Sequence, residues 1–78
     1  MIVYHVCTTN KLRKYLQSGG YIHSPVRVWE TIQQAERFSK NTGRKLILRL
    51  KFPRNSDKLP GHFGQARVLQ QKYKLDSI

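Results

Sequence analysis

Hydrophobic and polar positions alternate along four stretches of the chain with the two-residue period of β-strands. The alternation covers residues 2–7, 26–29, 45–52 and 65–71. In the third stretch every second residue is leucine or phenylalanine, and the positions between them are mostly basic. We therefore expect four strands, and we expect the third to bury one face and expose the other.

Two further segments have the three- and four-residue spacing of an amphipathic helix. The first follows the possible cap residues Thr8 and Thr9 and ends at the glycine pair 19–20, which tolerates the positive φ of a helix end. The second begins at Thr31, which has a capping-box glutamine three residues later, and ends at Gly43. The apolar stripes comprise Leu12, Tyr15 and Leu16 in the first helix and Ile32, Ala35 and Phe38 in the second.

The order of these segments predicts a single small domain of the α/β or α+β class that spans residues 1–78. Its elements follow the order β-α-β-α-β-β, with two helices packed on a mixed sheet. Residues 53–64 separate the last two strands and are rich in proline, glycine and short polar side chains. Because such a connection is long for a compact domain, we expect this loop to have a function.

Charge is the strongest bias in the composition. Fifteen lysines and arginines stand against four aspartates and glutamates, which gives a formal net charge of +11. This charge favours an acidic partner, and nucleic acid is the first expectation. The chain has no apolar run long enough to span a membrane and no signal-peptide pattern, so we expect a soluble, cytoplasmic protein.

Cysteine and histidine offer little for metal or thiol chemistry. Cys7 is the only cysteine, which excludes an intrachain disulfide and a cysteine-rich zinc site. Its place in an apolar strand is typical of an inert buried thiol. The histidines His5, His23 and His62 lack the spacing of metal ligands on one helix face, so the residues alone predict no metal and no other cofactor.

The basic residues are densest from the end of the second helix to the long loop. Arg49 and Lys51 share the polar face of a predicted strand, and Arg54 and Lys58 continue from it onto the loop. Aromatic side chains are interleaved with the basic ones, and exposed rings can stack on unpaired bases. We expect DNA or RNA to bind here, and the predicted contact residues are Arg44, Lys45, Arg49, Lys51, Arg54 and Lys58.

Three stretches, in order along the chain, resemble motifs of the ADP-ribosyltransferase fold, in the branch that includes RNA 2′-phosphotransferases and DNA-modifying members. The first is VYHV at residues 3–6 with the helix that follows it. The second is VWET at residues 28–31, which leads into the second helix and the strand at 46–50. The third is GQARVL at residues 64–69 with the tail. The resemblance implies a minimal or degenerate relative of this fold.

The resemblance also implies roles for single residues. His5 would hold the nicotinamide-side ribose of NAD, and Trp29, or alternatively Tyr21, would stack on the nicotinamide. Thr31 would be the hydroxyl of the second motif. Many members carry a catalytic glutamate at the start of the last strand, where this chain has Gln65. An active enzyme would thus use NAD with these residues, and turnover is expected to be absent or very slow because an amide lacks the negative charge that stabilises the cationic centre.

The sequence leaves three functions open. The leading one is a small basic domain that binds or acts on nucleic acid. The first alternative is an active enzyme that resembles ADP-ribosyltransferases or RNA 2′-phosphotransferases. If it resembles a phosphotransferase, Arg67, Arg27 and His62 would stand in for the basic residues of that branch. The other alternative is a small metal-independent RNase of the toxin type, in which His62 or His23 would be the general acid or base. Convergence of His5, Trp29 and Gln65 on one cleft is what the enzyme hypothesis requires.

Overall fold

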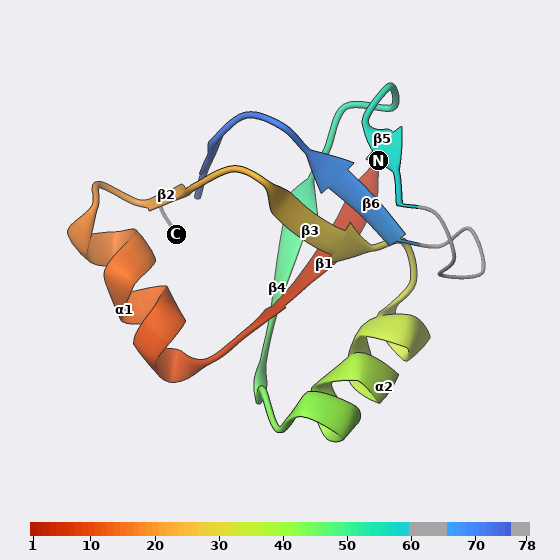
Figure 1. Cartoon of the computed structure of the whole chain (residues 1–78), viewed down its shortest axis with the longest axis horizontal. Helices are drawn as coiled ribbons and strands as arrows, with labels where there is room; N and C mark the ends of the chain where they lie inside the picture. The colour runs from red at the N-terminus through yellow and green to blue at the C-terminus, as the bar shows by residue number, and fades with distance from the viewer. Residues whose placement is uncertain (60–65, 76–78) are drawn as a thin grey trace.

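Seven strands and two helices make up the part of the chain that the computed structural model describes, residues 1–59 and 66–75 (Figure 1). Five strands form one sheet in the order β4-β1-β3-β6-β5, and the other two form a separate β2-β7 pair. The strands are β1 (Ile2–Cys7), β2 (Tyr21–Ile22), β3 (Val26–Trp29), β4 (Leu46–Lys51), β5 (Asp57–Lys58), β6 (Ala66–Leu69) and β7 (Tyr73–Lys74), and the helices are α1 (Thr9–Gln17) and α2 (Ile32–Thr42).

The helix ends lie at the residues that the sequence predicts. Thr8 caps α1 by accepting a hydrogen bond from the backbone N–H of Lys11 at 3.1 Å. Thr31 caps α2 in the same way, accepting from the N–H of Gln34 at 3.3 Å. Helix α2 ends at Gly43, whose φ of 72° lies in the left-handed region that favours glycine. These residues satisfy backbone groups that helix ends leave without partners, so the local sequence determines where these helix ends lie.

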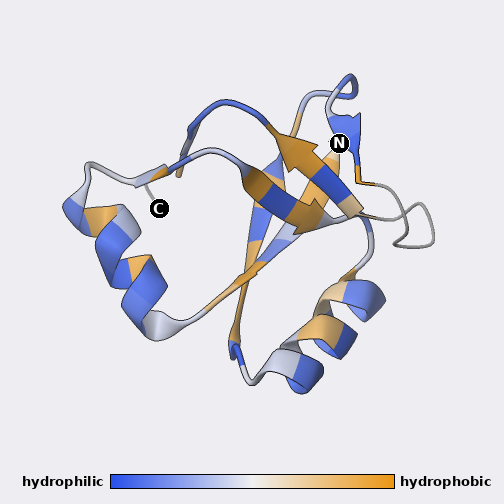
Figure 2. Cartoon of the chain, in the orientation of Figure 1, coloured by the Kyte–Doolittle hydropathy of each residue, from blue (hydrophilic) through white to orange (hydrophobic). Residues whose placement is uncertain are grey.

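One face of the five-stranded sheet carries the main hydrophobic core. Val3 and Leu50 are paired across β1 and β4, and both are buried. Tyr15 of α1 packs against this core, although α1 has no buried residue and is mostly polar in Figure 2. The buried members of the core are Val3, Ile22, Val26, Val28, Leu50, Phe52 and Leu69.

Helix α2 covers the opposite face of the sheet. Tyr4 pairs with Trp29 between β1 and β3, and both side chains point away from Val3 because neighbouring strand residues alternate between faces. The ring centroids of Trp29 and Phe38 of α2 lie 5.7 Å apart, and Ala35 of α2 is fully buried. The two helices therefore pack on opposite faces of the sheet.

The structure confirms the α+β form of the predicted fold, with two helices packed on the sheet. Every ladder in the described residues is antiparallel, whereas a mixed sheet was predicted. Three two-residue strands, β2, β5 and β7, were not predicted, because two residues are too few to show a period. Strand β5 lies inside the predicted loop 53–64 and pairs with β6, so part of this loop belongs to the sheet.

Candidate functional site

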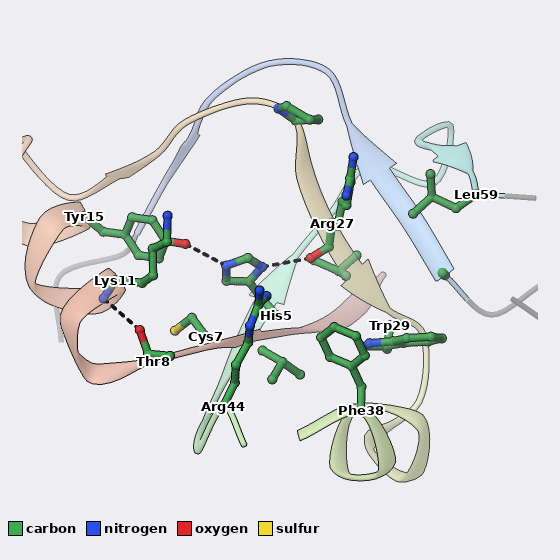
Figure 3. Close-up of a pocket in the computed structure, with 14 residues that line it drawn as sticks. His5, Cys7, Thr8, Lys11, Tyr15, Arg27, Trp29, Phe38, Arg44 and Leu59 are labelled. Atoms are coloured by element: carbon green, nitrogen blue, oxygen red, sulfur yellow. Dashed lines mark hydrogen bonds between the residues drawn. The ribbon is translucent and has the colours of Figure 1, made fainter. Parts of the chain in front are cut away.

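Strands β1 and β3 separate beyond Tyr4, and a cavity lies between them. Strand β1 pairs with β4 along its whole length, but it pairs with β3 only where Tyr4 lies opposite Trp29. The cavity has a volume of about 800 Å³. Side chains from β1, β3 and both helices line it, because the opening between the strands joins the two faces of the sheet (Figure 3).

His5 bridges the two separated strands. Its Nδ1 lies 2.8 Å from the carbonyl oxygen of Arg27 in β3, and its Nε2 lies 3.0 Å from the hydroxyl oxygen of Tyr15 in α1 (Figure 3). A carbonyl oxygen only accepts hydrogen bonds, so Nδ1 carries the proton of the neutral ring. Nε2 then accepts the hydrogen bond that the Tyr15 hydroxyl donates. Both ring nitrogens are thus held, and the tautomer follows from the Arg27 carbonyl.

The surroundings of His5 favour its neutral form. Burial lowers the pKa of His5 below its ordinary value of 6.5. The hydrogen bond to the Arg27 carbonyl raises this pKa, and the positive charge of Arg44 lowers it further. The pKa of Tyr15 is raised by burial and, to a smaller extent, by Cys7, while Arg44 opposes the change. Burial also raises the pKa of the Cys7 thiol, which fits the predicted inert thiol.

Trp29 and Phe38 form an aromatic wall of the cavity. Their ring planes are inclined by 49°, and Trp29 is only partly buried. The guanidinium carbon of Arg44 lies 5.8 Å from the centroid of the Phe38 ring. A planar group that entered the cavity would therefore meet both an aromatic surface and a positive charge, as a nucleobase with its phosphate requires.

Three basic side chains reach the cavity from different parts of the fold. Lys11 comes from α1, Arg27 from β3 and Arg44 from the segment between α2 and β4. All three residues are exposed. Among the described residues that line the cavity there is no aspartate or glutamate. This lining is positive at neutral pH, which suits a ligand that carries phosphate.

The long loop after β4 contributes another wall of the cavity. Leu59 lines it, and the N–H of Leu59 donates to the carbonyl of Ala66 at 2.9 Å. Next to Ala66, Arg67 donates from Nη1 to the Ser56 carbonyl at 2.8 Å, and its Nε lies 3.4 Å from Oε1 of Glu30. The side chains of Arg67 and Glu30 are only 12% and 22% exposed. The ion pair joins β6 to the β3–α2 connection, and the hydrogen bond to Ser56 links the same Arg67 side chain to the loop.

The structure brings together two of the residues that the family resemblance singles out. His5 and Trp29 line the same cavity. Thr31 caps α2 and is not among the described residues of the lining. Tyr21, the alternative to Trp29, lies in β2, where Nζ of Lys72 is 4.4 Å from its ring centroid.

The remaining candidates for chemistry are scattered or lie elsewhere. Gln65 and His62 fall outside the described residues, although Ala66, the neighbour of Gln65, lines the cavity. His23 is exposed in the connection between β2 and β3. Of the two arginines suggested for the phosphotransferase alternative, Arg27 lines the cavity, whereas Arg67 is held by its ion pair.

Only one member of the predicted basic cluster lines the cavity, and that member is Arg44. Arg49 and Lys51 are exposed on the polar face of β4, as the alternation predicts. The other three members, Lys45, Arg54 and Lys58, are exposed as well.

Three side chains of the site were missed by sequence reasoning. The helical spacing predicts only that Tyr15 and Phe38 lie on the apolar stripes of their helices, and nothing in the sequence singles out Lys11. A signal was present for Tyr15, because a tyrosine that packs on a core usually needs a partner for its hydroxyl. His5 was a polar residue within an otherwise largely apolar strand. Nothing in the sequence indicated that the sheet opens beside it.

Within residues 1–59 and 66–75, no group of three or more histidine, cysteine, aspartate or glutamate side chains is arranged to hold a metal ion. No helix in the same residues is long and apolar enough to cross a bilayer.

Comparison of the chain with protein-family models, with curated proteins and with solved structures found no match.

Proposed function

We propose that this protein binds single-stranded nucleic acid and takes one nucleotide unit into the cavity between β1 and β3. The observation that carries the proposal is the lining of this cavity: Lys11, Arg27 and Arg44 from three elements, the Trp29–Phe38 wall, and no carboxylate among its described residues. The basic side chains meet the phosphate, and the base lies against the aromatic wall.

Single strands fit this site better than duplexes. Bases in a duplex are stacked and paired, whereas the bases of a single strand can turn outward and stack on protein aromatic rings. The net charge of +11 attracts either polymer at long range. The exposed basic cluster at β4 and the following loop, which includes Arg49 and Lys51, contacts phosphates outside the cavity.

Trp29 makes the proposal directly testable, because it is the only tryptophan in the chain. Titration with a single-stranded oligonucleotide should change the fluorescence of Trp29. The double variant Lys11→Ala, Arg44→Gln should lose most of this change, because it removes two cavity cations. The matched double variant Arg49→Ala, Lys51→Ala removes the same charge outside the cavity, so it should weaken binding but keep the fluorescence change at saturation. Tight binding without any change at Trp29 would place the nucleic acid elsewhere and refute the proposal.

A second candidate function is supported by the meeting of His5 and Trp29 in one cavity. An enzyme that resembles ADP-ribosyltransferases would bind NAD there, with the cations on its phosphates and the aromatic wall on a ring. The described lining offers no carboxylate to stabilise a cationic ribose centre, so we expect weak NAD binding and little turnover. Backbone NMR shifts of His5 and Trp29 during NAD titration, with an assay of nicotinamide release, test this candidate. Rapid release would replace the binding function with the enzymatic one.

A further inference from the structure

The contact between Tyr15 and His5 places a proton-accepting pair at the cavity. Nδ1 of His5 donates to the Arg27 carbonyl, so Nε2 accepts from the Tyr15 hydroxyl at 3.0 Å. A hydroxyl has one proton to donate and two lone pairs to accept with. Tyr15 donates its proton to Nε2, and the lone pairs of its oxygen can accept a hydrogen bond from a second hydroxyl group. Because Tyr15 itself lines the cavity, that second hydroxyl can belong to a ligand.

We propose that Tyr15 and His5 together deprotonate the ribose 2′-hydroxyl of an RNA held in the cavity, so that the protein cleaves RNA by transesterification. This inference rests on the nucleic-acid binding proposed above and adds a reaction to it. A hydroxyl next to a phosphodiester is the group in a nucleic acid that a base can turn into an internal nucleophile. DNA lacks that hydroxyl, so the reaction is specific for RNA.

The step balances with the groups that line the cavity. The 2′-hydroxyl gives its proton to the Tyr15 oxygen while Tyr15 gives its own proton to Nε2 of His5. The 2′-oxygen forms a bond to phosphorus, and the bond from phosphorus to the 5′-oxygen breaks. The leaving 5′-oxygen takes a proton from the ammonium group of Lys11. The products are a 2′,3′-cyclic phosphate and a 5′-hydroxyl end, and solvent later removes the proton from His5 and restores the one on Lys11.

The charges around this pair suit the reaction in two ways. Arg27 and Arg44 stand at the same cavity and stabilise the negative charge that grows on the pentavalent phosphate. Burial and Arg44 also keep His5 in its neutral, proton-accepting form near pH 7. Tyr15 acts only as a carrier, because its raised pKa disfavours a free phenolate and the two proton transfers must occur together.

The geometry selects His5 rather than the histidines that the sequence suggested for such a reaction. His23 is exposed between β2 and β3 and is not among the described residues of the lining. His62 lies outside the described residues. Of the two histidines within residues 1–59 and 66–75, His5 is the one that combines a fixed tautomer, a hydroxyl partner and cavity cations.

The test uses an oligodeoxynucleotide that contains a single ribonucleotide, incubated with the full chain in excess EDTA. Cleavage is expected only on the 3′ side of that ribonucleotide, with a 2′,3′-cyclic phosphate on the 5′ fragment. His5→Asn keeps a donor for the Arg27 carbonyl but lacks Nε2, and Tyr15→Phe removes the hydroxyl alone. Each should lower the cleavage rate by about 10²-fold or more. His23→Asn is the matched control and should cleave at the wild-type rate.

Binding of the all-deoxy oligonucleotide, which cannot be cleaved, separates the two proposals. If the wild type binds it but does not cleave the ribonucleotide-containing strand, the reaction is refuted and the binding function stands. If cleavage occurs but Tyr15→Phe and His5→Asn cleave as fast as the wild type, the proposed pair is refuted. If neither strand binds, both proposals fail. Cleavage that is lost in both variants, while their affinity for the all-deoxy strand stays near the wild-type value, supports the inference.

Discussion

The hydroxyl of Tyr15 lies 3.0 Å from Nε2 of His5, and this contact between residues ten positions apart joins helix α1 to strand β1. Helix α1 has no buried residue, so its attachment depends on partly buried side chains such as Tyr15. The same hydrogen bond therefore has two consequences. It fixes α1 beside the opening of the sheet, and it presents a neutral histidine and a tyrosine hydroxyl to the cavity.

Removing only the Tyr15 hydroxyl should destabilise the fold measurably. Tyr15→Phe loses one hydrogen bond and leaves the half-buried Nε2 of His5 without its protein partner, which costs about 1 kcal/mol in the free energy of unfolding. Urea denaturation monitored by Trp29 fluorescence measures this change. Leu16→Ala is a control on the same helix, because Leu16 is 61% exposed and should contribute little. Equal effects of the two substitutions would mean that the hydroxyl does not anchor α1.

The lowered pKa of His5 predicts a specific loss of stability in mild acid. The folded state prefers the neutral ring, and its pKa lies below the 6.5 of the unfolded chain. Above pH 6.5 the full contribution is present. As the pH falls from 6.5 through the folded pKa, the unfolded chain takes up the proton first and the contribution is lost. The Cys7 thiol and the Tyr15 hydroxyl both have raised pKa values, so neither of them loses its proton in this range.

Unfolding free energies measured between about pH 8 and about pH 5 test this expectation. The wild type should lose more stability over this range than His5→Asn, which has no titrating group at this position. The rest of the sequence is the same in both proteins, so the comparison isolates position 5. In addition, ¹⁵N shifts of the imidazole at neutral pH should show the proton on Nδ1. Parallel pH profiles for the two proteins, or a proton on Nε2, would contradict the hydrogen-bond assignment.

The ion pair between Glu30 and Arg67 should matter more than an exposed pair. Glu30→Gln leaves the Arg67 side chain, which is only 12% exposed, with the Ser56 carbonyl as its remaining partner among the described residues and without a neutralising charge. Leaving a largely buried charge unpaired costs about 1–3 kcal/mol. Glu36→Gln makes the same chemical change at an exposed position of α2 and should be nearly neutral. A similar effect of both substitutions on the urea midpoint would show that the Arg67 contact does not hold the loop.

Local sequence was sufficient to predict most of the fold. The caps at Thr8 and Thr31 and the glycine at 43 define helix ends through hydrogen bonds within a few residues, so they can be recognised without knowing the tertiary structure. The long alternation of β4 likewise identifies its buried and exposed faces. The two-residue strands β2, β5 and β7 depend on partners far along the chain, and no local pattern encodes them.

The candidate site was predicted only in part, for a related reason. His5 and Trp29 were identified through a resemblance, and their meeting depends on the register of Tyr4 opposite Trp29. The opening beyond that pair is a property of two strands that diverge, which neither strand's sequence specifies alone. Lys11 and Tyr15 join the site through the placement of α1, and sequence periodicity assigns them only to a helix face.

Salt dependence tests how much of the binding is carried by charge. For single strands the logarithm of the affinity falls with the logarithm of the salt concentration by about 0.7 for each phosphate neutralised. We expect a slope between about −3 and −6, which corresponds to several phosphates. In the proposed complex the cavity takes one nucleotide unit, so most of these phosphates must lie outside it, on exposed basic residues such as Arg49 and Lys51.

The slope and the fluorescence of Trp29 therefore report different parts of the same complex. Arg49→Ala with Lys51→Ala should make the slope shallower by about 1.4, because two phosphate contacts are lost, and should leave the Trp29 signal at saturation intact. Lys11→Ala with Arg44→Gln should reduce the Trp29 signal. This double variant should make the slope shallower only by the contribution of the phosphates bound in the cavity. Measurements from about 50 mM salt upward separate these effects. A slope near zero, or no binding to any single strand at the lowest salt, would show that the net charge of +11 does not drive binding to nucleic acid.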